Sequence, residues 1–144
     1  MWIDRLVESR LRNALELSAR FAEERHKVLA ENVANIDTPD YHSKRLDAAP
    51  FEAALGEALH QAKRADSHRL NVRTAQVSAA AGGSMSVEPA AEPAANALLH
   101  DGTNARLESL MTDVQRNAMT HSLATNMLKS RFESLLTAIR GRNG

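Results

Sequence analysis

The residue types that carry most enzyme and metal chemistry are present but too scattered to form a site. None of the six histidines lies three or four residues from another, the spacing with which one helix holds a metal ion. The absence of cysteine removes any thiol nucleophile. Gly82 and Gly83 lack the lysine of a phosphate-binding loop, and no serine lies in a nucleophile elbow. We therefore expect no catalytic residue, cofactor, metal ion or enzyme activity.

Charge and hydropathy argue against two classes of partner. The 144-residue chain has 18 basic and 18 acidic residues, and their interleaving leaves no basic stripe for nucleic acid. No apolar run approaches the roughly 20 residues that span a membrane. The apolar residues near the N-terminus are interrupted by charges, unlike those of a cleaved signal peptide. We expect neither nucleic-acid binding nor direct membrane insertion.

The polar residues with the most specific spacing lie in one ten-residue stretch that must reverse the chain. Asparagine favours caps and turns, and a proline ends a helix because it lacks a backbone N–H and restricts the residue before it. Proline followed by aspartate also suits the centre of a β-turn. The motif residues are Asn32, Asn35, Thr38, Pro39 and Tyr41. They could form an ordinary helix end, or a turn that a particular class of protein requires.

Two long amphipathic helices flank this turn and must position it. The first is predicted from Trp2 to about Asn35, and the last from about Asp101 to about Arg140. Apolar residues recur every seven positions in each, namely Val7, Ala14, Phe21 and Val28, then Leu107, Val114, His121, Leu128 and Leu135. We interpret His121 as a packed or interface histidine, because it lies in an apolar stripe.

The apolar residues are densest near the end of the last helix. They are Leu128, Phe132, Leu135 and Ile139. Two paired helices form only a thin core, and isolated amphipathic helices are marginal in water. We therefore hypothesise that this patch packs between subunits.

The middle of the chain gives weaker signals. Pro50 suits the first turn of a short helix that continues to about Arg64. Residues 75–97 are rich in Ala, Gly, Pro and Ser and lack alternating β-branched residues, so we expect a flexible loop there rather than strands.

These elements predict an all-α fold. The N- and C-terminal helices would pair as an antiparallel, coiled-coil-like bundle beside a short middle helix and a flexible, low-complexity loop. The expected units are residues 1–47 (helix and turn), 48–74 (short helix and connector), 75–100 (loop) and 101–144 (last helix).

Motifs at both ends of the chain resemble the bacterial flagellar basal-body rod protein family, closest to its proximal rod proteins. Near the N-terminus the motif is Asn-x-x-Asn-x-x-Thr-Pro-x-Tyr, and Asp40 stands where the family usually has Gly. Near the C-terminus the similar positions are Asp101 to Asn104, Leu107, Glu108, Met111, Asn117, Ala118, Leu128, Phe132, Leu135 and Thr137 to Ile139. The resemblance covers roughly residues 1–70 and 98–142.

The resemblance implies a structural subunit of the flagellar rod that assembles helically and transmits torque. It also implies a location in the rod within the periplasmic space, and type III export without a cleaved signal peptide. The implied partners are other rod subunits, including further copies, and ring or export-gate components at the rod base.

One alternative of a different class is a cytoplasmic coiled-coil adaptor or export chaperone. Such a protein would also contain long amphipathic helices, but it would have no reason to carry the Asn-x-x-Asn-x-x-Thr-Pro-x-Tyr turn.

Overall fold

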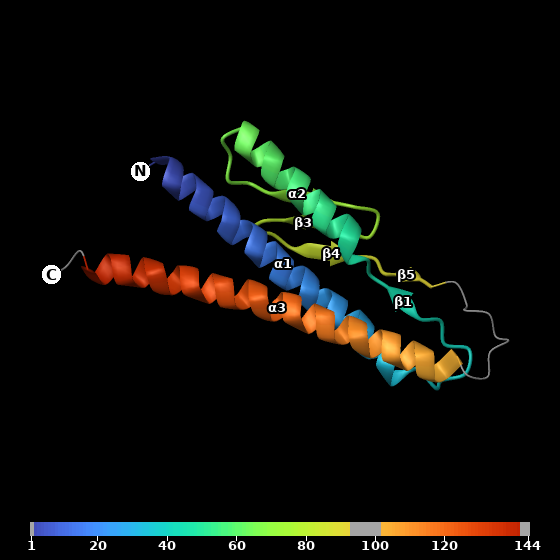
Figure 1. Ribbon diagram of the computed structural model, residues 1–144. Coiled ribbons are helices and arrows are strands. Elements are labelled where there is room, and N and C mark those ends of the chain that lie inside the picture. The colour runs from blue at the N-terminus through green and yellow to red at the C-terminus, as the bar shows by residue number, and fades with distance from the viewer. Residues whose placement is uncertain (1, 93–101, 142–144) are drawn as a thin grey trace.

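The computed structural model describes the backbone of residues 2–92 and 102–141. Three helices account for most of it: α1 (Trp2–Ala34), α2 (Ala48–Arg64) and α3 (Gly102–Gly141). Figure 1 shows α1 in the middle, with α3 along one side of it and α2 together with short strands along the other. The helices α1 and α3 run in opposite directions, so the chain reverses between them.

The expectation of an all-α fold was wrong, because five short strands form two antiparallel sheets. In the smaller sheet, β1 (Lys44–Arg45) pairs with β5 (Ala90–Ala91). In the larger one, the order is β2 (Asn71–Arg73), β3 (Val77–Ala80) and β4 (Met85–Val87). The register places Val72 opposite Ala79 and Val77 opposite Val87.

The expectation of a flexible loop over residues 75–97 fails for the same reason. Strands β3, β4 and β5 all lie in this range, and burial alternates along β3, where Val77 and Ala79 face the core while Ser78 is exposed. Gly82 supplies the positive φ of 74° in the turn between β3 and β4. Residues 93–97 lie outside the described residues.

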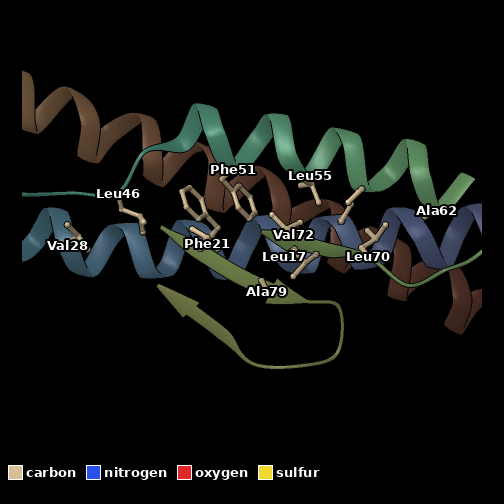
Figure 2. Packing of buried hydrophobic residues seen from close by; sticks show 13 residues of the cluster. Leu17, Phe21, Val28, Leu46, Phe51, Leu55, Ala62, Leu70, Val72 and Ala79 are labelled. Carbon is tan, nitrogen blue, oxygen red and sulfur yellow. The ribbon is translucent and has the colours of Figure 1, made fainter. Parts of the chain in front are cut away.

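The main core lies between α1, α2 and the three-stranded sheet. Figure 2 shows the side chains of α1 and α2 meeting those of the strands. The rings of Phe21 and Phe51 stack with their centroids 4.0 Å apart. Leu17, Leu70 and Val72 are each almost completely buried around them. Burial of this apolar surface is the main driving force that holds α2 and the sheet on α1.

Helix α2 ends in a compact C-terminal cap. The backbone N–H of Ser67 donates to the oxygen of Ala62 at 2.9 Å, and that of Asp66 donates to Lys63 at 3.4 Å. Asp66 has a φ of 45°, the left-handed conformation that this type of cap requires. The chain then turns back so that β2 lies beside α2.

Helix α3 contributes little to this core. Among its described side chains, only Asn117 and Ala124 are buried. Figure 1 shows α3 close to α1 near the turn end and diverging from it toward the two chain termini. Much of the apolar surface of α3 is therefore left in contact with solvent.

Candidate assembly surfaces

Asn32, the first of the predicted turn residues, lies at the end of α1, and its side chain is buried. Its Nδ2 donates to the main-chain oxygen of Lys44 at 2.7 Å, while its Oδ1 accepts from the backbone N–H of Lys44 at 2.9 Å. The same Oδ1 accepts the hydroxyl of Tyr41 at 3.0 Å. Asn32 thus pairs with Lys44 as a neighbouring strand would, and holds β1 against α1.

The remaining motif residues form the turn itself. The Nδ2 of Asn35 donates to the oxygen of Glu31 at 2.8 Å. The backbone N–H of Tyr41 donates to the oxygen of Thr38 at 3.3 Å, which closes a β-turn with Pro39 and Asp40 at its centre. The φ of Asp40 is 60°. Proline followed by a residue with positive φ is the type II arrangement, in which Gly is favoured at the second central position.

The pKa values of Tyr41 and Lys44 are both raised, by burial in the first case and by Glu31 in the second. Burial raises the pKa of the Tyr41 hydroxyl, and the charge of Glu31 adds to that effect. A 2.6 Å contact between Lys44 Nζ and Glu31 Oε1 raises the pKa of Lys44. Both groups therefore keep their protons to a higher pH in the folded chain than in the unfolded one.

Arg25 connects three segments and was not among the site residues predicted from the sequence. Its Nε donates to the main-chain oxygen of Leu46 at 3.0 Å, and its Nη2 lies 3.4 Å from Oδ1 of Asp113 in α3. The Arg25 side chain is only 17% exposed, so these contacts replace most of its hydration. Its position at the edge of the apolar stripe of α1 was the available signal.

Gln76 links the two sheets and was also missed. Its Nε2 donates to the oxygen of Arg45 at 2.8 Å, while its Oε1 accepts the backbone N–H of Asp47 at 3.0 Å. A lone glutamine between predicted elements gives no sequence signal of such a role. The effect is to fasten the start of α2 to the hairpin of β2 and β3.

Asn117 joins the two terminal helices. It is 4% exposed, and its Nδ2 donates to the main-chain oxygen of Ala22 at 2.7 Å. A buried asparagine in a helix–helix contact favours the one register in which its amide is satisfied. The structure thus places this predicted site residue in the intramolecular contact between α1 and α3.

The other predicted residues of α3 lie beyond this contact. Leu128 is half-buried, whereas Phe132, Leu135 and Ile139 are 52%, 42% and 63% exposed. The turn residues and this patch lie at opposite ends of the α1–α3 pair (Figure 1), so the structure does not bring them together in one molecule. Sequence reasoning also missed the exposed Leu136, which lies beside Leu135.

Two hollows flank the contact between α1 and α3. One, of about 220 Å³, is polar and lies between α1, β1 and the start of α3, with Arg25, Asp113 and Lys44 in its wall. The other, of about 320 Å³, lies further along the two helices and is lined by Ala22, Glu23, His26, Asn117, Ala118, His121 and Ser122.

Within the described residues, no group of three or more His, Cys, Asp or Glu side chains is placed to hold a metal ion. None of the helices in the described part of the chain combines the length and apolar character needed to cross a membrane.

Comparison with known proteins relates the chain to the flagellar rod. It is 29% identical over 128 residues to the flagellar basal body rod protein FlgB of Borrelia hermsii, which covers 81% of this chain and 85% of that protein. No protein-family model matches the chain. The comparison agrees with the resemblance drawn from the two motifs and supports a relationship to FlgB-like rod proteins. A rod protein is a structural protein, in agreement with the expectation that the chain is not an enzyme.

Proposed function

We propose that this chain is a structural subunit of the bacterial flagellar basal-body rod. The observation that carries the proposal is the similarity to a rod protein, which extends over most of both chains. The geometry supports it in two places. The Asn-x-x-Asn-x-x-Thr-Pro-x-Tyr motif builds a hydrogen-bonded turn around Asn32, and the end of α3 presents apolar side chains to solvent.

Assembly through the terminal helices is the mechanism that this surface favours. Phe132, Leu135 and Ile139 belong to one side of a long helix, and their exposure is costly unless another subunit covers them. A contact between different surfaces of successive subunits does not close on itself, so it extends into a helical array. Helices packed along such an array would transmit torque, because packed interiors deform little.

The proposed partners are those that a subunit of the basal-body rod would contact. They are further copies of the chain, other rod subunits, and ring or export-gate components at the base of the rod. We propose a position in the periplasmic part of the basal body and export through the flagellar type III apparatus without a cleaved signal peptide.

Imaging of basal bodies tests this function directly. A tagged chain should purify with basal bodies from motile cells, and deletion of its gene should leave cells without a rod and without motility. The cytoplasmic adaptor or export chaperone predicts a different outcome, in which the tagged chain remains in the cytoplasm and is absent from purified basal bodies. That result would overturn the proposal.

A further inference from the structure

The hollow between α1 and α3 offers space for side chains of another helix, and its lining combines small residues with polar ones. Its floor and walls carry the small side chains of Ala22, Ala118 and Ser122, and these leave about 320 Å³ of space between the two helices. Ala118 is exposed, whereas Ala22, on the other helix, is only 1% exposed. Small residues at such a position allow large side chains of another helix to approach the backbone closely.

The end of α3 exposes large apolar side chains that could fill such a hollow. Phe132, Leu135, Leu136 and Ile139 are 52%, 42%, 51% and 63% exposed. They occupy positions i, i+3, i+4 and i+7, which places them on one side of the helix. This is the spacing with which an amphipathic helix anchors itself in an apolar groove.

The exposed apolar end of α3 lies on the same side of the helix as the residues that pack on α1, and this indicates what kind of surface should cover it. The side of α3 that carries Asn117, His121, Ala124 and Leu128 faces α1, and successive seven-residue steps from His121 reach Leu128 and then Leu135. The apolar end therefore continues the side that packs on α1, beyond the point where the two helices diverge (Figure 1). A surface of the α1 type is its natural complement, and a second copy of the chain supplies one.

The end of α3 is basic, and one acidic side chain borders the hollow. After Leu128, the described part of α3 carries Lys129, Arg131 and Arg140 against a single acid, Glu133. The residues that line the hollow include one acid, Glu23, two histidines and no lysine or arginine, and Oε1 of Glu23 lies 3.6 Å from Nζ of Lys27. Opposite charges favour encounter and orientation even where they add little to affinity.

We propose that the α3 end of one copy, Phe132 to Ile139, packs into the hollow around Ala22 and Ala118 of a second copy. This inference rests on the proposed function and specifies which two surfaces meet. Each copy offers both surfaces, so the contact is heterologous and extends without closing. The two surfaces are centred roughly 16 residues apart on α3, so copies that run in the same direction would be displaced by about 24 Å.

Cysteine cross-linking tests the pairing, since the chain has no cysteine of its own. Single variants Ala118→Cys and Leu136→Cys are purified, mixed at high concentration and treated with a short bismaleimide. We expect a cross-linked dimer in the mixture at several times the yield of either variant alone. A matched mixture of Asn126→Cys with Leu136→Cys, in which Asn126 is another exposed position of α3, should give a low yield.

Blocking the hollow supplies the second measurement. Ala118→Trp should keep the circular dichroism spectrum and melting temperature of the unmodified chain, yet lower self-association in sedimentation by about tenfold or more. The matched variant Asn126→Trp should associate normally. Normal association of Ala118→Trp, with cross-links formed only away from the hollow, would overturn this pairing but leave the rod assignment intact. Complete absence of self-association would overturn the contact between copies, while basal-body imaging tests the rod assignment separately.

Discussion

The hydroxyl of Tyr41 donates a 3.0 Å hydrogen bond to Oδ1 of Asn32, nine residues earlier in the chain. The same oxygen accepts the backbone N–H of Lys44, so one asparagine side chain fixes both the turn and the strand that follows it. This relationship explains why asparagine and tyrosine occur together in the motif. It also makes the turn a rigid link between α1 and β1, rather than a loose connection.

Replacing Asn32 should therefore destabilise the chain. Asn32→Ala removes three hydrogen bonds and leaves both main-chain groups of Lys44 without these partners, so the free energy of unfolding should fall by about 1–3 kcal/mol. Tyr41→Phe removes only one of these bonds and should cost about 0.5–1.5 kcal/mol. Urea unfolding measures both values. Equal stability of Asn32→Ala and the unmodified chain would show that the turn does not contribute to folding.

Asp40 offers a stabilising substitution. Its φ of 60° is strained for a residue with a Cβ atom, and glycine adopts it without that strain. Asp40→Gly should raise the free energy of unfolding by about 0.5–1 kcal/mol. The matched control is Asp37→Gly in the same turn, because Asp37 does not have positive φ and glycine there should only add freedom to the unfolded chain. A loss of stability in Asp40→Gly would contradict the turn geometry.

Alkaline pH should loosen the same turn. The pKa values of Tyr41 and Lys44 are both raised in the folded chain, so the folded state binds these protons more tightly than the unfolded state. Their contribution is fully present below the ordinary pKa values near 10 and is lost as pH rises through the raised values. Thermal unfolding of the unmodified chain should show a falling melting temperature above about pH 10. The fall should be smaller in a Tyr41→Phe, Lys44→Met double variant.

The turn could be predicted from the sequence because its interactions are local. The side chains of Asn32, Asn35, Pro39 and Tyr41 act within ten residues of one another, and their preferences do not depend on the rest of the fold. The long helices were predictable for a similar reason, since their apolar periodicity extends over many turns.

The sheets could not be predicted in the same way. Strands β1 to β5 are two to four residues long, too short for alternation to be distinguished from chance. Val77 and Ala79 are buried only because α1 and α2, distant in sequence, lie beside them. The contacts of Arg25 and Gln76 also depend on tertiary structure.

The division into units 1–47, 48–74, 75–100 and 101–144 stays a prediction.

The buried position of Val77 places the hairpin of β3 and β4 in the hydrophobic core. Val77→Ala removes two methyl groups from a side chain that is 3% exposed, so it should lower the free energy of unfolding by about 1–3 kcal/mol. Ser78→Ala, at the exposed neighbouring position, should change it by less than about 0.5 kcal/mol. Deleting residues 77–87 should abolish cooperative unfolding, as followed by circular dichroism. Retention of a sharp transition would indicate that α1 and α2 do not need the sheet.

The exposed end of α3 gives the test of assembly in cells. Leu135 is 42% exposed, so Leu135→Asp should lower the stability of the isolated chain by only about 1 kcal/mol, mainly through helix propensity. In an assembled rod the same aspartate would be buried without a partner, which is strongly unfavourable. We therefore expect a soluble, folded variant that fails to enter basal bodies and leaves cells without motility.

The control for this change is Glu108→Gln, at an exposed position near the other end of α3, which should preserve motility. Circular dichroism and sedimentation of purified Leu135→Asp distinguish an assembly defect from a folding defect. A folded Leu135→Asp chain in motile cells with normal rods would show that this side of α3 does not form the contact between subunits. The exposed apolar side chains at Phe132, Leu136 and Ile139 would then need another explanation, and the assembly mechanism proposed from them would fail.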